Sequence, residues 1–332
     1  MIFLASNENP LGMPDSARQA AAAALQGSGS YPDANGTALK KALSQRLNVP
    51  PDWLTLGSGS SEILTLAAQA TVQPGHSVVF SQFAFVVYAQ AAAQMLARAT
   101  VVPARDYGHD LPSMRAAMDD GTRLVFIANP NNPTGTFIEG PALRAFLESV
   151  PAHVTVLLDE AYTEYLAPAQ RYDSIGWVRQ FPNLIVARTF SKAYGLAGLR
   201  VGYGVAQPAL TAQLNARRPR FNVGTPALAA AEAALADDAF VAKSREMNAA
   251  GRIQLGAGLL ELGLTSVPSA GNFLMVCVGD AGGVNARLAK AGIAVSMLDN
   301  YGLPQWLRIT VGQPQQNEKV LAALRDALET SA

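Results

Sequence analysis

The stretch RTFSKAYGLAGLRVGYGV, Arg188 to Val205, is the part of the chain that says most about its fold and chemistry. It contains Lys192, one of only six lysines, with hydroxyl groups nearby at Thr189 and Ser191, and small residues lead from there to Arg200. An amine held among small side chains in a partly dry pocket loses some of its preference for the charged form. A neutral amine can form a Schiff base with an aldehyde. The stretch therefore indicates a reactive lysine, although a lone lysine at a strand end is more often only structural.

Short, continuously apolar runs alternate with helical segments on the N-terminal side of this stretch and within it. The predicted strands are residues 76–81, 99–104, 122–130, 153–162, 183–189 and 200–206. Continuous rather than alternating apolarity means burial on both faces, as in a mostly parallel sheet covered by helices. The order of elements predicts an α/β fold.

The pattern changes near Thr225. A long helical region is expected over 226–262, followed by strand-like segments at 273–279, 293–298 and 306–312 and a last helix from Asn317. This order is typical of a smaller α+β domain. We expect a large domain over residues 29–225 and a small domain made of residues 1–28 together with 226–332.

Composition excludes several classes of protein. The 332 residues are 49% hydrophobic and 15% charged, with a net charge of zero. The only basic cluster, ARRPR at 216–220, reads as a solvated loop, so no nucleic-acid partner is expected. Cys277 is alone and the three histidines are scattered, which argues against a metal site. No apolar run is long enough for a membrane span or signal peptide, so we expect a cytoplasmic protein without a membrane partner.

Polar residues follow three of the buried strands, where ligands collect in open α/β sheets. Asp159 comes directly after a buried run, and a carboxylate there needs a cationic partner to offset its desolvation. A pyridinium nitrogen would serve. Pyridoxal 5'-phosphate needs both a lysine for its aldehyde and an acid that keeps its ring nitrogen protonated. The plainer interpretation of Asp159 is a helix cap, a role that the neighbouring Glu160 suits better.

Other segments offer groups for the remaining parts of such a cofactor. The loop LGSGSSEIL, 56–64, places Ser60 and Ser61 at an expected helix start, where backbone N–H groups bind phosphate. Asn132, in the rigid loop NPNNPTG (129–135), and the Tyr162 hydroxyl could donate to a ring oxygen. Phe85 could stack on a flat ring, although core packing is the usual role of a phenylalanine.

These segments together resemble the fold-type I pyridoxal-phosphate aminotransferases, and most of all the histidinol-phosphate aminotransferases. The resemblance rests on NPNNPTG, LDEAYTEY (158–165) and TFSKAYGLAGLRVGY (189–203) in this order and spacing. It extends from LASNENPLG at 4–12 to WLRITVG at 306–312, which is almost the whole chain. It implies a sheet of the seven-stranded type in the large domain.

The resemblance also implies a role for each matching residue. Lys192 binds the cofactor aldehyde and shuttles protons, Asp159 pairs with the ring nitrogen, Asn132 and Tyr162 contact the ring oxygen, and Phe85 stacks on the ring. The phosphate is held by Ser60, Ser61, Thr189, Ser191 and Arg200. Tyr31 reaches the cofactor phosphate of a neighbouring subunit, which implies a homodimer with shared active sites. Arg308 binds the anionic end of the substrate, and Asn9 lies near the substrate.

Two departures concern substrate recognition. Relatives carry an arginine in a VIVRP-like run, where this chain has Ser296 in IAVSMLDN, 293–300. Arg220 stands where relatives tend to have proline and is a candidate to replace that arginine as a substrate-binding residue. The chain also begins close to its LASNENP segment, so we expect a shorter N-terminal arm than in relatives.

The resulting functional hypothesis is transfer of an amino group between a small-molecule donor and a keto acid. By resemblance, the pair is L-histidinol phosphate and 2-oxoglutarate. Alternatives in the same fold are transamination of another amino acid, such as an aromatic one, and a decarboxylase resembling threonine-phosphate decarboxylase. A catalytically silent binding module is the alternative of a different class, and the joint presence of Lys192, Asp159 and Arg308 speaks against it.

Overall fold

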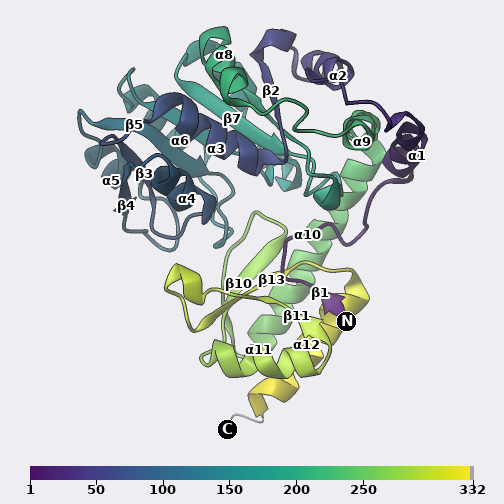
Figure 1. Cartoon of the computed structure of the whole chain (residues 1–332). Coiled ribbons are helices and arrows are strands. Elements are labelled where there is room, and N and C mark those ends of the chain that lie inside the picture. The colour runs from purple at the N-terminus through teal and green to yellow at the C-terminus, as the bar shows by residue number, and fades with distance from the viewer. Residues whose placement is uncertain (330–332) are drawn as a thin grey trace.

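The computed structural model of the chain describes residues 1–329 and divides into a larger and a smaller unit, joined by one long helix (Figure 1). The larger unit contains a seven-stranded sheet in the order β2-β8-β7-β6-β5-β3-β4. Its strands are β2 (Leu54–Gly57), β3 (Ser77–Ser81), β4 (Arg98–Val102), β5 (Thr122–Ala128), β6 (Thr155–Asp159), β7 (Leu184–Thr189) and β8 (Gly202–Val205). The five strands from β7 to β4 are parallel, whereas β8 pairs antiparallel with both β7 and β2. The predicted, mostly parallel sheet is thus confirmed, with β2 as a strand that the sequence did not reveal.

Two apolar cores cover the two faces of this sheet, because successive strand side chains point to opposite faces. On β5, Leu124 and Phe126 join one core, whereas Val125 and Ile127 join the other. The first core is completed by α3 (Ser60–Thr71), α4 (Val87–Gln94) and α8 (Pro208–Arg217). The second is completed by α2 (Thr37–Leu47), α5 (Leu111–Ala116), α6 (Gly140–Ser149) and α7 (Ser174–Gln180). Burial on both faces explains the continuous apolar runs in the sequence.

The smaller unit holds both described ends of the chain (Figure 1). Its antiparallel sheet has the order β12-β13-β10-β9, made of β9 (Thr265–Val267), β10 (Phe273–Cys277), β12 (Ser296–Met297) and β13 (Trp306–Thr310). The N-terminal strand β1 (Ile2–Phe3) pairs with β11 (Ile293–Ala294), and α11 (Ala281–Lys290) and α12 (Pro314–Glu329) pack nearby. This is the α+β arrangement that the sequence predicted.

The helical region expected over 226–262 is two helices, α9 (Thr225–Leu235) and α10 (Asp238–Glu261). The break falls at Asp237, whose side chain accepts a hydrogen bond from the Phe240 N–H and so caps α10. An N-terminal aspartate of this kind satisfies a free N–H of the first helical turn. The described part of the chain also contains six short 3-10 helices: η1 (Leu25–Gly27), η2 (Pro51–Trp53), η3 (Thr163–Tyr165), η4 (Pro168–Gln170), η5 (Ala197–Leu199) and η6 (Asp299–Tyr301).

The packing of two helices bears on where the two domains divide. α1 (Asp15–Ala24) packs against α9, and Ala17 of α1 and Ala230 of α9 are buried in a core of the larger sheet. Small side chains on both helices allow this close approach. By packing, α1 and α9 belong with the larger unit, and we propose that the division lies at the break between α9 and α10. None of the helices within residues 1–329 has the length and apolarity to cross a membrane.

Candidate active site

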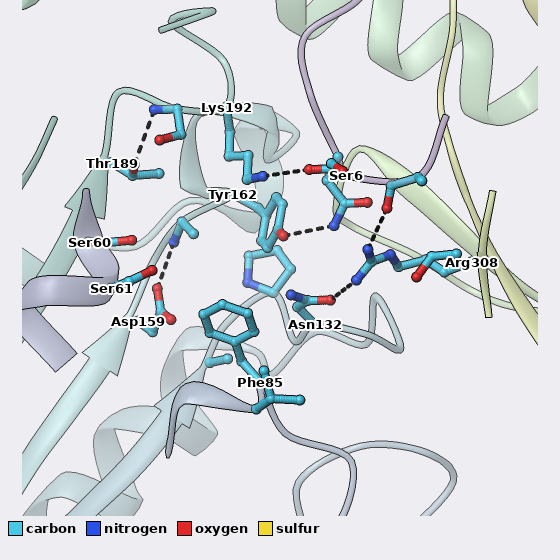
Figure 2. Close-up of a pocket in the computed structure, with 18 of the residues that line it drawn as sticks. Ser6, Ser60, Ser61, Phe85, Asn132, Asp159, Tyr162, Thr189, Lys192 and Arg308 are labelled. Carbon is cyan, nitrogen blue, oxygen red and sulfur yellow. Dashed lines mark hydrogen bonds between the residues drawn. The ribbon is translucent and has the colours of Figure 1, made fainter. Parts of the chain in front are cut away.

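A cavity of about 730 Å³ lies where the carboxyl ends of the large-sheet strands face the smaller unit. Its wall contains all but three of the residues predicted from the sequence. The predicted residues that line the cavity are Ser60, Ser61, Phe85, Asn132, Asp159, Tyr162, Thr189, Ser191, Lys192, Arg200 and Arg308. Figure 2 shows most of these side chains converging on one space. Because parallel strands end at the same edge of the sheet, residues far apart in sequence become neighbours here.

Lys192 extends into this space from the loop after β7. Its Nζ donates a hydrogen bond to the Ser6 carbonyl oxygen at 2.9 Å and lies 6.0 Å from the centre of the Tyr162 ring. Burial, reinforced by the positive charge of Arg308, lowers the pKa of Lys192 to about 8, against the opposing influence of Glu8. A lysine with this pKa is partly neutral near physiological pH, as the sequence suggested.

Asp159 ends β6 and is 5% exposed. Its Oδ2 accepts a hydrogen bond from the Tyr88 hydroxyl at 2.9 Å, and its Oδ1 accepts one from the Ala161 N–H at 3.2 Å. Burial raises the pKa of Asp159 to about 6, while the Tyr88 hydrogen bond opposes that rise. A cation in the cavity would offset this desolvation and hold the carboxyl group ionised.

Tyr162 follows Asp159 by three residues and turns its hydroxyl into the cavity. That hydroxyl accepts a hydrogen bond from Asn7 Nδ2 at 3.0 Å, and the ring packs edge-on against Phe273. Burial raises the pKa of Tyr162 to about 12, so the phenol remains protonated and can donate to an acceptor in the cavity. Asn7 lines the cavity but was not predicted as a site residue, although it lies within the NENP segment of the resemblance.

An anion-binding corner lies at the N-terminus of α3. The helix begins at Ser60, and its N-cap residue, Gly59, supplies no side-chain hydrogen bond, so the first N–H groups remain available. Arg200 approaches from the loop before β8 and donates to Ser191 Oγ at 3.1 Å. The Thr189 hydroxyl lies in the same wall and accepts from the Ser191 N–H at 3.1 Å.

Two glycines make this corner possible. A Cβ at Gly59, where φ is +77°, would lie 2.2 Å from Arg200 Nη2. A Cβ at Gly202 on β8 would lie 2.3 Å from the Ser60 nitrogen. Any larger residue would therefore separate the guanidinium, the strand and the helix N-terminus. The close packing of these three groups provides several donors for one phosphate-sized anion.

Arg308 reaches the opposite end of the cavity from β13. It donates to Asn132 Oδ1 at 2.6 Å and to the Ala5 carbonyl oxygen at 2.7 Å, while its buried Nε lacks a partner within residues 1–329 (Figure 2). The guanidinium also lies over the Phe273 ring at 5.5 Å. A buried arginine with an unsatisfied donor suits an anionic group, because a carboxylate can accept from its planar fork.

The rest of the wall around Arg308 is uncharged, with polar side chains and the apolar Val295 and Met297. Ser296 on β12 is paired in register with Arg308, so the neighbour at that position is a hydroxyl and not a second cation. Asn285, Asn300 and Tyr301 complete this side of the cavity. No motif in the sequence points to these three, because α11 and η6 reach the cavity only through the fold of the smaller unit.

Three predicted residues lie off the cavity wall. Asn9 is buried behind it and donates to the Ala193 carbonyl oxygen and to Ser244 Oγ, so it supports the loop that carries Lys192. Tyr31 is 83% exposed and stacks on Phe221 at 4.7 Å between ring centres. The Arg220 guanidinium lies over the Phe221 ring, 5.3 Å from its centre. Within one chain, neither Tyr31 nor Arg220 reaches the site.

Comparison with known proteins identifies the family. The sequence profile of the family described as "Aminotransferase class I and II" matches residues 1–324. This chain belongs to that aminotransferase family. The resemblance expected from the motifs is thereby confirmed over nearly the whole chain.

Two similar curated relatives and one similar solved structure are all named histidinol-phosphate aminotransferase. Histidinol-phosphate aminotransferase 1 of Cupriavidus pinatubonensis is 59% identical over 333 residues, covering 99% of this chain and 89% of that protein. Histidinol-phosphate aminotransferase 2 of Ralstonia nicotianae is 59% identical over 332 residues with the same coverage. The solved histidinol-phosphate aminotransferase of Sinorhizobium meliloti, in complex with pyridoxal-5'-phosphate, has a TM-score of 0.94 and 30% identity, covering 100% of this chain and 91% of that one. The fold is that of the type I aminotransferases.

The cavity of this aminotransferase fits a phosphorylated pyridine aldehyde. The anion-binding corner, the buried carboxyl group of Asp159 and the amine of Lys192 lie along one side of it. Phe85 supplies a flat ring surface and Tyr162 supplies a hydroxyl group in the same wall. Arg308 then remains, on the far side, for a separate anionic group. Within residues 1–329 the chain holds no cluster of acidic, histidine or cysteine side chains suited to a metal ion.

Proposed function

We propose that this aminotransferase uses pyridoxal 5'-phosphate to move the amino group of L-histidinol phosphate to 2-oxoglutarate. The products are imidazole acetol phosphate and L-glutamate, so the protein would act in histidine biosynthesis. The observation that carries the proposal is the meeting, in one cavity, of the Lys192 amine, the Asp159 carboxyl group and the anion-binding corner at Ser60. The names of the relatives at 59% identity support the choice of substrate.

Each group along the cofactor side has a role in this proposal. Bound pyridoxal phosphate supplies an aldehyde that exchanges amines and a protonated ring that withdraws electrons. Asp159 would hold the proton on the ring nitrogen through a buried ion pair. Asn132 and Tyr162 would donate to the ring oxygen, and the phosphate would be held by Ser60, Ser61, Thr189, Ser191 and Arg200.

Lys192 carries the proton transfer. Since its pKa is about 8, the neutral amine is accessible without strongly basic conditions, and its Nζ can accept the α-proton of the amino donor. The hydrogen bond to the Ser6 carbonyl oxygen holds Nζ within the cavity. Arg308 binds the anionic end of the substrate and thereby orients the α-carbon toward that amine.

A second candidate is transamination of an unphosphorylated amino acid, such as an aromatic one. The neutral wall formed by Ser296, Asn300 and Tyr301 favours it, because among residues 1–329 a phosphate on this side of the cavity would meet Arg308 as the one lining cation. Decarboxylation of a phosphorylated amino acid is a further possibility for the same cofactor. These alternatives differ in product and can be separated directly.

We also propose that the active form is a homodimer in the cytoplasm. The exposed Tyr31 stacks on the half-buried Phe221 beside Arg220, and a second subunit covering this surface would bring Tyr31 and Arg220 to its own cavity. Mixing inactive Lys192→Ala protein with an inactive Tyr31 variant should then restore partial activity in mixed dimers. A fully active monomer in light scattering would contradict the shared site.

The decisive experiment for the reaction is a screen of amino donors with 2-oxoglutarate. Purified protein reconstituted with pyridoxal phosphate should show the visible absorption of a lysine-bound cofactor and release glutamate with histidinol phosphate. Aromatic amino acids and threonine phosphate serve as competing donors, and carbon dioxide is measured in parallel. Absence of the absorption band refutes the cofactor, whereas carbon dioxide without glutamate would make the protein a decarboxylase.

A further inference from the structure

Tyr88, on α4, is fully buried and forms part of the cavity wall. Its ring stacks on Phe126 with centres 4.5 Å apart and planes 2° from parallel. The Phe85 ring meets it edge-on at 6.2 Å and 87°. Packing on these sides fixes the ring, and its hydroxyl is directed at Asp159 Oδ2, 2.9 Å away. One side chain therefore touches both the acid and the aromatic ring assigned to the cofactor.

The hydrogen bonds of Asp159 make this contact important. Within residues 1–329, Tyr88 is the only side chain that donates to the carboxyl group, and the Ala161 N–H is the other donor. Oδ2 has no backbone donor of its own. Without the phenol, this oxygen would be left buried beside apolar rings, and a buried unsatisfied charged group is costly.

The charge state of Asp159 is closely balanced. Burial raises its pKa to about 6, and neighbouring Glu160 raises it further, whereas the Tyr88 and Ala161 hydrogen bonds and the Lys192 charge lower it. The Tyr162 hydroxyl is the other titratable group close to the carboxyl group. Among the influences that favour the carboxylate, the Tyr88 hydrogen bond is the largest. Losing it would shift the balance toward the neutral acid near physiological pH.

We propose that Tyr88 is a positioning residue, whose hydroxyl keeps Asp159 ionised and aimed at the cofactor ring nitrogen and whose ring supports Phe85. This inference rests on the proposed pyridoxal-phosphate function. Tyr88 forms part of the cavity wall, and the role assigned to it is exerted through its hydroxyl on Asp159 and through its ring on Phe85. If Tyr88 were purely structural, only its ring would matter, and a phenylalanine at this position would serve equally well.

Tyr88→Phe tests the proposal, since it removes only the hydroxyl. The first measurement is the dissociation constant of pyridoxal phosphate, followed by titrating apoenzyme between about pH 5 and 8, where Asp159 changes charge. Affinity should fall as pH drops through the pKa of Asp159 in the apoenzyme. In Tyr88→Phe that fall should begin at higher pH, and the dissociation constant at neutral pH should rise about tenfold, as expected for a lost hydrogen bond to a charged group.

Tyr203→Phe is the matched control. Tyr203 on β8 is equally buried, but its hydroxyl faces Arg188 rather than Asp159. This variant should leave both the affinity and the pH midpoint unchanged. Thermal denaturation of both apoenzymes shows whether each has folded.

A double-mutant cycle with Asp159→Asn separates a specific effect from a general one. If Tyr88 acts through Asp159, then adding Tyr88→Phe to Asp159→Asn should not weaken cofactor binding further. Unchanged affinity and midpoint in Tyr88→Phe would overturn the proposal, as would an equal loss in the Asp159→Asn background. Wild-type protein that fails to bind pyridoxal phosphate would instead refute the proposed function, whatever the variants do.

Discussion

The two sides of the cavity differ in how they are built. The cofactor side lies on the ends of β6 and β7 and on the start of α3, which belong to the larger sheet and its cores. The substrate side is formed by the two-residue strand β12, by η6 and by Arg308 on β13. The first side is rich in charged and hydrogen-bonding groups in fixed positions. The second offers one buried arginine among uncharged side chains, some polar and some apolar.

This contrast separates chemistry from specificity. Groups that must hold one geometry for every substrate are placed on strands buried on both faces, where packing leaves little freedom. Groups that choose the substrate are placed on short segments, which can change with little effect on the core. Substitutions on the cofactor side should therefore abolish the reaction, whereas those on the substrate side should change its rate for particular donors.

The largest effect is expected at Lys192. Lys192→Ala removes the amine that binds the aldehyde and moves the proton, so amino transfer should become undetectable while pyridoxal phosphate still binds through its phosphate. Single-turnover absorbance with an amino donor measures the first half of the reaction. Lys319→Ala, on the exposed surface of α12, should behave as wild type. Normal turnover by Lys192→Ala would exclude this lysine as the catalytic base.

Asp159→Asn should have the next largest effect. The amide keeps the shape of the side chain but cannot hold a proton on the ring nitrogen. We expect kcat to fall by about two orders of magnitude or more, as when a fixed electrostatic stabiliser is removed, while cofactor remains bound. Steady-state kinetics with saturating cofactor measure this loss. Asp110→Asn is a suitable control, because Asp110 caps α5 and asparagine caps equally well. A wild-type rate for Asp159→Asn would contradict the ion pair.

The sequence predicted the cofactor side far better than the rest. Lys192 and Asp159 follow continuous apolar strands, so their positions at one sheet edge could be inferred from the pattern. Tyr88 could not, because it lies one turn beyond Phe85 in an apolar helix, and only the fold directs its hydroxyl at Asp159. The break between α9 and α10 was missed for a related reason. Its alanine-rich sequence continues the helical pattern, and only the Asp237 cap marks the boundary.

On the substrate side, Arg308→Lys should have an intermediate effect. Lysine keeps the charge but loses the planar fork that can bind an anion through two parallel hydrogen bonds. A hydrogen bond to a charged group contributes about 1.5–3 kcal/mol, so kcat/KM should fall roughly ten- to a hundredfold, with unchanged affinity for the cofactor. Arg325→Lys, exposed on α12, is the control. A loss of cofactor binding in Arg308→Lys would mean that the two sides are not separable in the way the structure suggests.

The smallest and most informative effect concerns Ser296. Residues directly opposite in an antiparallel pair lie about 5 Å apart, so Ser296→Arg would place a second guanidinium beside Arg308. Two adjacent cations repel one another in the free enzyme but attract a doubly charged phosphate. The variant should therefore raise kcat/KM for histidinol phosphate by about tenfold, as one charged hydrogen bond would, and leave unphosphorylated donors unchanged or slower.

Arg220 provides the counterpart to that experiment. If a neighbouring subunit supplies Arg220 to the phosphate, Arg220→Ala should lower kcat/KM for histidinol phosphate by roughly tenfold or more, and Ser296→Arg should restore part of the loss. Arg217→Ala, three residues earlier at the end of α8, controls for the change in surface charge. An efficient wild type that neither Ser296→Arg nor Arg220→Ala alters would mean that neutral donors such as Asn300 and Tyr301 suffice for the phosphate. In that case the substrate side would recognise its ligand by hydrogen bonds rather than by charge, and the cofactor side would be unaffected.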